Sequence, residues 1–131
     1  MSDAAAQPKP AEPTGELAIR TIAMPAAINP SGDVFGGWVV SYMDLAAGIS
    51  AVSHAKGRVV TAGITQLSFL RPVKVGDVMC CYTDLTRTGR TSLTLRVEAW
   101  VLRRGEGDRL KVTEADFTMV AVDAEGRPRP L

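Results

Sequence analysis

The spacing of apolar residues predicts one long helix in a chain that is otherwise rich in strands. After the loop that ends at Gly37, large apolar side chains recur at steps of three and four residues, which places them on one stripe of an α-helix. The stripe consists of Trp38, Tyr42, Leu45, Ile49 and Val52. We expect it to face a core, and we expect Gly57 to end the helix.

Five other segments alternate in polarity or are rich in β-branched residues, and they predict five strands. They are residues 17–23 before the helix and 58–70, 78–86, 92–101 and 110–122 after it. Gly63 indicates a bulge in the second of them. The segment 92–101 alternates most clearly, so we expect one of its faces to be packed and the other, from Ser92 to Trp100, to be largely solvated.

The order of these elements predicts an α+β fold. A single helix is the only partner for a strongly antiparallel sheet with short connections, so the sheet should curve around the helix. One helix covers only part of such a sheet. The remaining edges and faces should pair with a second copy, and we therefore expect a dimer.

Size and composition narrow the class of protein. A chain of 131 residues forms one domain, and we expect residues 1–14, rich in Ala and Pro, to be a disordered tail before a domain at 15–131. A net charge of +1 without a basic stripe argues against nucleic acid as a partner. No apolar run is long enough for a membrane span, so we expect a soluble, cytoplasmic protein without a membrane partner.

The cysteine and histidine residues indicate neither a disulfide nor a metal site. Cys80 and Cys81 are adjacent in a predicted strand, so their side chains point to opposite faces and cannot easily form a disulfide. With one histidine, His54, and no CxxC motif, a metal site is not expected.

Asp44 is the one charged residue between Asp33 and Lys56. Placing a carboxylate among apolar neighbours costs on the order of several kcal/mol unless the carboxylate is paired or its pKa rises. Two interpretations follow. The carboxylate either sits at a solvated gap or bonds to the sheet, or it is a general base or nucleophile beside a substrate.

Several sequence blocks together resemble the hotdog-fold acyl-CoA thioesterases, in particular the YciA-type bacterial enzymes. The blocks are residues 29–38, 43–44, 68–73, 75–77 and 121–128, and the resemblance covers about residues 17–130. It implies a five-stranded antiparallel sheet around one long central helix and a homodimer with active sites across the interface, assembling further to a hexamer as a trimer of dimers. It also implies hydrolysis of acyl-CoA without a cofactor, since coenzyme A is part of the substrate.

The same resemblance assigns roles to residues of the site. Asp44 matches the catalytic carboxylate, Asn29 matches an asparagine supplied by the other protomer, and the N–H groups of Gly36 and Gly37 would polarise the thioester carbonyl. Asp44 would act as general base on a water that Asn29 orients, or as nucleophile through a mixed anhydride. From the residues alone, an ordinary turn residue before proline is the favoured interpretation of Asn29, and Gly36 and Gly37 could be only an N-cap region that needs unusual dihedral angles.

Coenzyme A carries phosphates, for which arginines are suited. Arg71, Arg87 and Arg90 are candidates, and each could instead be a solvated loop charge. Ser68 and Phe69 match positions along which the family's ligand passes. A non-catalytic module that binds or senses acyl-CoA is the alternative function, and the presence of both Asp44 and Asn29 speaks against it.

Overall fold

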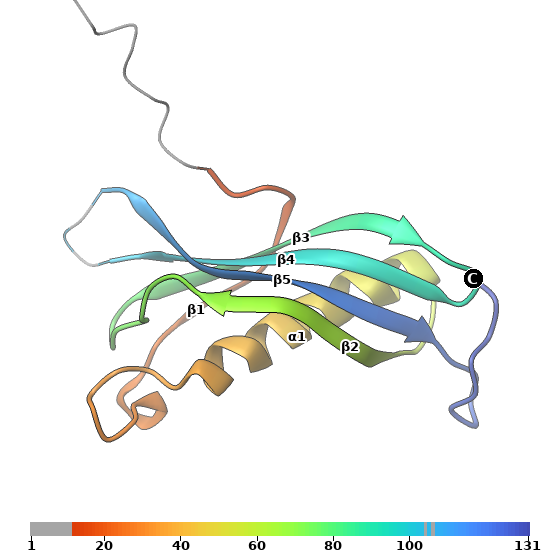
Figure 1. The fold of residues 1–131 in the computed structure, drawn as a ribbon, viewed down its shortest axis with the longest axis horizontal. Coiled ribbons are helices and arrows are strands. Elements are labelled where there is room, and N and C mark those ends of the chain that lie inside the picture. Colours follow the sequence, from red (N-terminus) through yellow and green to blue (C-terminus); the bar gives the residue numbers. More distant parts are fainter. Residues whose placement is uncertain (1–11, 104, 106) are drawn as a thin grey trace, which may run out of the picture.

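A five-stranded antiparallel sheet curves around one helix in the computed structural model, which confirms the predicted architecture (Figure 1). The structure describes residues 12–103, 105 and 107–131, so most of the predicted tail lies outside the described residues. The elements are β1 (Glu16–Ile22), a short 3₁₀ helix (Pro25–Ala27), α1 (Gly36–Ala55), β2 (Val59–Phe69), β3 (Val78–Thr88), β4 (Ser92–Leu102) and β5 (Arg109–Ala121).

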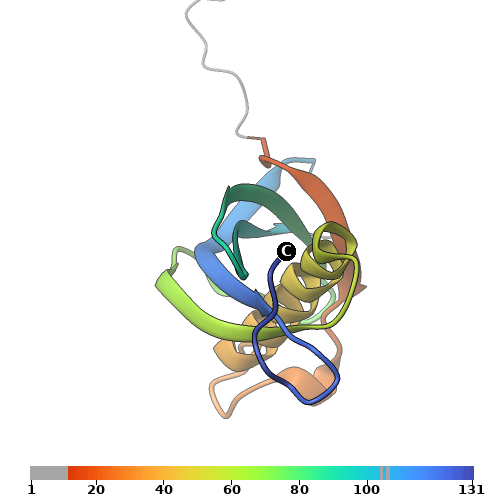
Figure 2. The same cartoon turned by 90° about the vertical axis from the view of Figure 1, so that its right-hand side faces the viewer.

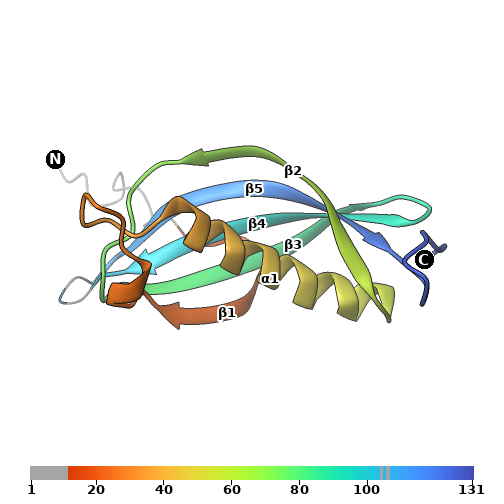
Figure 3. The same cartoon turned by 90° about the horizontal axis from the view of Figure 1, so that it is seen from below.

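The strand order is β1-β3-β4-β5-β2, so β1 and β2 form the two edges. Seen end-on, the sheet wraps around α1 (Figure 2), and from below the helix lies along its concave face (Figure 3). The register of β2 against β5 shifts between Thr61 and Gly63, which confirms the predicted bulge. A second shift, between Thr65 and Ser68, was not predicted, and there Gln66 has a positive φ of 59°.

The face of α1 that packs on the sheet is not the predicted one. Its buried residues are small or medium in size, namely Val39, Met43, Ala46, Ala47, Ala51 and Ala55. The sheet already supplies large side chains to the core, such as Leu95 and Phe117, so small helix residues let the backbones approach. Of the predicted stripe, Trp38 and Tyr42 are half-buried, and the other three residues are exposed: Leu45 55%, Ile49 54% and Val52 45%.

The outer face of β4 is also less solvated than predicted, because β4 is a central strand whose neighbours cover it. Glu98 and Trp100 are 5% and 3% exposed. Trp100 Nε1 donates to Glu98 Oε1 at 2.8 Å, and Lys111 Nζ lies 6.0 Å from the centre of the Trp100 ring. Polar and aromatic groups on this face are therefore paired with one another rather than with water.

The C-terminal end of α1 differs slightly from the prediction. Lys56, and not Gly57, takes the left-handed conformation that ends the helix, with a φ of 55°. Arg129 Nη2 donates to the Ala55 carbonyl at 2.9 Å and so satisfies one of the last carbonyl groups of the helix. Among the described residues, no helix has the length and apolar character that crossing a membrane requires.

Cys81 faces the core and should resist alkylation in the folded protein. Its side chain is buried, and burial, followed by the neighbouring Cys80 thiol, raises its pKa to about 12. At pH 8 only about one Cys81 in 10⁴ would be a thiolate, the reactive form. Mass spectrometry after iodoacetamide treatment should therefore find Cys81 unmodified in the native protein and modified after unfolding. Rapid native labelling at Cys81 would contradict this burial.

Candidate active site

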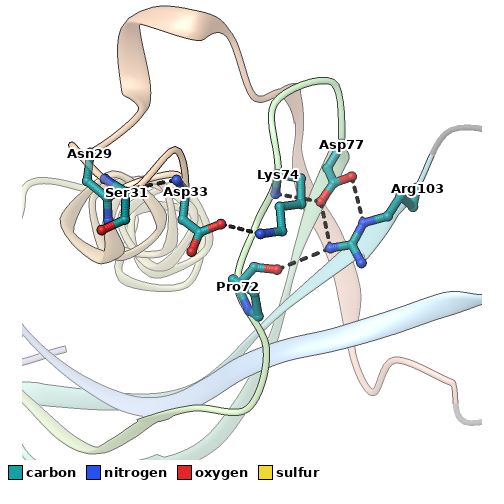
Figure 4. Close-up of polar contacts among 7 residues, drawn as sticks. All are labelled: Asn29, Ser31, Asp33, Pro72, Lys74, Asp77 and Arg103. Atoms are coloured by element: carbon teal, nitrogen blue, oxygen red, sulfur yellow. Dashed lines mark hydrogen bonds and ion pairs between the residues drawn. The ribbon is translucent and has the colours of Figure 1, made fainter.

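The loop before α1 is organised by the side chain of Asn29. Its Oδ1 accepts hydrogen bonds from the backbone N–H groups of Ser31 at 2.9 Å and Asp33 at 3.1 Å (Figure 4). Asn29 therefore acts as a turn residue, which was one of the two roles considered from the sequence. Because the amide oxygen faces these donors, the amide nitrogen faces away from them, and it has no hydrogen-bond partner in the part of the chain that the structure describes. Asn29 can therefore still donate to a ligand or water.

The start of α1 presents free backbone donors. The N-cap residue Phe35 makes no side-chain cap, and the first turn contains no acidic residue. Within the described chain, the N–H groups of Gly36 and Gly37 have no acceptor, and both residues are exposed. Unpaired N–H groups at the positive end of a helix dipole stabilise negative charge nearby. This is the geometry that an oxyanion site requires.

A cavity of about 370 Å³ adjoins this helix start. Four of the residues predicted from sequence to form the site line it, namely Asn29, Gly36, Phe69 and Arg71. The Phe69 ring lies against Gly36, so closely that a Cβ added there would be 3.2 Å from the ring. Glycine at position 36 thus lets an aromatic wall approach the helix backbone.

Asp44 lies in the ninth position of α1 and is half-buried. Its Oδ1 accepts a hydrogen bond from Thr61 Oγ1, on β2, at 2.6 Å. The carboxylate lines an apolar groove of about 590 Å³ together with Leu45, Gly48, Ile49, Val52, Val59, Thr61 and Met119. It is neither sealed from solvent nor fully occupied by protein groups. Thr61 was not singled out from sequence, because only the pairing of β2 beside α1 brings it to Asp44.

The two parts of the predicted site are separate within one chain. No residue lines both the cavity at the helix start and the groove at Asp44. Along an ideal helix, Asp44 is displaced from Gly37 by roughly 10 Å. A ligand that contacts both parts of a site must therefore draw one of them from another copy of the chain, or span this distance.

The remaining predicted ligand residues are dispersed. Arg71 borders the first cavity, where its Nη1 also donates to the Lys111 carbonyl at 2.8 Å. Ser68 lies on β2 next to Phe69, and its carbonyl accepts from the Thr113 hydroxyl. Arg87 and Arg90 belong to the hairpin between β3 and β4, which lies at the opposite end of the sheet from the loop before α1 (Figures 1 and 3). One chain does not bring these two arginines to the others.

The described residues contain no group of three or more His, Cys, Asp or Glu side chains that could hold a metal ion. The groove between β1 and the second half of α1, of about 680 Å³, includes His54 and Asp84 but none of the predicted site residues.

Known proteins share both the sequence and the shape of this chain. A model of the thioesterase superfamily matches residues 31–107. Acyl-CoA thioester hydrolase YciA of Salmonella typhimurium is 51% identical over 122 residues, which cover 91% of this chain and 92% of that protein.

Two solved structures have the same fold. The hexameric thioesterase y2039 from Yersinia pestis has a TM-score of 0.87 and 51% identity, covering 92% of this chain and 98% of its own. HI0827, a hexameric broad specificity acyl-coenzyme A thioesterase solved as an aspartate-to-alanine mutant enzyme, has a TM-score of 0.87 and 45% identity, with coverage of 89% and 86%.

Proposed function

This chain belongs to the thioesterase superfamily and is an acyl-CoA thioester hydrolase, and we propose that Asp44 carries its reaction. The observation that supports this role is the environment of the carboxylate. Asp44 is half-buried in an otherwise apolar groove, holds one hydrogen bond from Thr61, and remains open to a ligand. A carboxylate in an apolar groove that still has free hydrogen-bond acceptor sites can act as a general base or as a nucleophile.

The chemistry divides between Asp44 and the helix start. As general base, Asp44 takes a proton from a water whose oxygen attacks the thioester carbon, and the carbon–sulfur bond then breaks to release coenzyme A. In the covalent route, the carboxylate itself attacks and water hydrolyses the resulting mixed anhydride. In either route, the N–H groups of Gly36 and Gly37 stabilise the oxyanion, each contributing about 3 kcal/mol. The Asn29 amide nitrogen orients the water.

We propose that the complete site forms between two copies. Asn29 and Gly36 line one cavity and Asp44 another, and no residue is shared. The exposed apolar face of α1 and the edge strand β2, which has β5 as its one partner, offer a surface for a second copy. A homodimer would place Asn29 of one protomer opposite Asp44 of the other. A trimer of such dimers would match the hexameric state of y2039 and HI0827.

Coenzyme A would lie along the cavity wall formed by Phe69 and Arg71, with Ser68 beside them. Arg71, which lines this cavity, would bind a phosphate of coenzyme A. Arg87 and Arg90 would reach coenzyme A only in a site to which another copy contributes its β3–β4 hairpin.

A turnover screen across acyl chain lengths, from acetyl-CoA to palmitoyl-CoA, tests the function. We expect release of the coenzyme A thiol with a kcat above about 1 s⁻¹ for the preferred substrates. Binding of acyl-CoA without turnover at any chain length would instead favour the non-catalytic sensing module. Absence of both binding and turnover would contradict the proposed function as a whole.

The hydrogen bond from Thr61 should matter for turnover. Thr61→Val keeps the side-chain shape and removes the donor that orients Asp44, so we expect kcat to fall by about tenfold. Thr61→Ser, which keeps the hydroxyl, should retain most of the activity. Thr118→Val, on β5, is the matched control and should leave kcat within about twofold. Equal kcat values for both valine variants would show that the bond to Asp44 has no catalytic role.

A further inference from the structure

A buried ion pair lies behind the loop that carries Asn29. The Asp77 side chain, just before β3, is 2% exposed, and it accepts hydrogen bonds from Arg103 Nε and Nη2, both at 3.1 Å (Figure 4). Arg103 follows the end of β4. Two parallel N–H···O bonds to one carboxylate fix the relative orientation of both groups. The pair therefore ties the end of β4 rigidly to the start of β3.

This pair also fixes the backbone of residues 72–77. Arg103 Nη2 donates to the Pro72 carbonyl at 3.2 Å, and the Lys74 N–H donates to Asp77 Oδ2 at 2.8 Å. The Asp77 carbonyl accepts from the Ala23 N–H at 3.0 Å, which anchors the same turn to the end of β1. Two side chains thus hold both ends of the segment.

The segment in turn holds the residues that precede α1. The Val34 N–H donates to the Val73 carbonyl at 3.0 Å, and Lys74 Nζ forms an ion pair with Asp33 (Figure 4). Asp33 bonds to the Asn29 side chain, and Val34 stands two residues before Gly36. A continuous series of hydrogen bonds and ion pairs therefore joins the Arg103–Asp77 pair to the Asn29 side chain and to the residues just before α1.

We propose that Arg103 and Asp77 are positioning residues for the helix start and the Asn29 loop. This inference rests on the proposed function. Neither residue lines the cavity at Asn29, so both act through residues 72–74 rather than on the substrate. Without the guanidinium, Asp77 would be a buried carboxylate whose one remaining side-chain donor among the described residues is the Lys74 N–H, and the turn would have to rearrange. A displacement of about 1 Å at catalytic groups costs on the order of 10²-fold in rate.

The test compares Arg103→Met with a control that loses an equivalent ion pair elsewhere. Arg96, on β4, pairs with Glu114 and Asp116, and its side chain is 28% exposed, against 27% for Arg103. Both variants should lower Tm by removing a partly buried cation. We expect Arg103→Met alone to lower kcat, by roughly 10- to 100-fold with KM changed less than about threefold, and Arg103→Lys to recover part of it. Arg96→Met should keep kcat within about twofold.

Equal kcat values for folded Arg103→Met and Arg96→Met would overturn the proposal. Should Arg103→Met not fold, Lys74→Met decides, because Lys74 is exposed and links the turn to Asp33. A kcat lowered by about three- to tenfold at unchanged Tm would support the positioning role, and wild-type kcat would overturn it.

Asp44→Asn, measured in parallel, separates this proposal from the function on which it rests. Wild-type hydrolysis by Asp44→Asn would reject the catalytic assignment, whatever Arg103→Met does. An inactive Asp44→Asn together with a fully active Arg103→Met would reject the positioning role alone.

Discussion

Asp44→Ala is expected to lose hydrolysis of acyl-CoA by about 10³-fold or more in kcat while the protein remains folded. General-base catalysis contributes about 10²–10⁴-fold, and loss of a nucleophile costs at least as much. The stability of the fold should not fall, because the Asp44 side chain makes a single hydrogen bond within the described residues, with Thr61, and alanine has a higher helix propensity than aspartate. Initial rates with the preferred acyl-CoA measure the loss of kcat. Circular dichroism and size-exclusion chromatography show whether the protein remains folded.

Asp84→Ala provides the matched control for this substitution. Asp84 is an exposed carboxylate on β3, away from the groove that contains Asp44. Its loss should change kcat less than about twofold. If Asp44→Ala turns over substrate at a rate near wild type, another group must activate the water, and the role assigned to Asp44 is wrong.

Mixing inactive Asn29→Ala and Asp44→Ala chains should restore activity to about a quarter of the wild-type value. Random exchange makes about half of the dimers hybrids, and each hybrid has one intact site if Asn29 and Asp44 act across an interface. Each parent variant should be impaired, Asn29→Ala by about 10²-fold through loss of an oriented donor. The measurement is the specific activity of an equimolar mixture after subunit exchange.

Subunit exchange itself must be verified, for example by native mass spectrometry of chains that differ in mass. A control mixture of Asp44→Ala with Asp44→Asn chains contains no intact site and should stay inactive. If hybrids form and activity does not return, Asn29 and Asp44 belong to the same site within one chain, and the proposed shared site is wrong.

The fold could be predicted because local patterns and connection lengths agree. Alternation identified five strands, and the short links after Gly57 left antiparallel pairing as the natural arrangement. The buried face of α1 was mispredicted because both of its sides are apolar. Periodicity finds the stripe of large residues, but it cannot tell whether that stripe or the opposite one packs on the sheet. In the structure, Val39 and Met43 of the opposite stripe are buried, whereas Leu45 and Ile49 of the predicted stripe are exposed.

Candidate site residues could be selected from the sequence where a residue type contradicted its surroundings. Asp44 stood out as the charge in an apolar helix, and Asn29 and Gly36 stood out through the motif that contains them. Thr61 and Arg103 carried no such signal, because a threonine in a strand and an arginine after one are ordinary. Their partners are 17 and 26 residues away, so only the assembled sheet reveals the contacts.

The irregular edge strand β2 has a consequence for solubility at high concentration. Its ladder is interrupted near Gly63 and again at Gln66, where the backbone turns into the left-handed region. A straight foreign strand can pair with only the short regular stretches between these interruptions, so open-ended growth into fibrils lacks a continuous template. The same two distortions thereby make the free edge of β2 a poor template for aggregation of the folded protein.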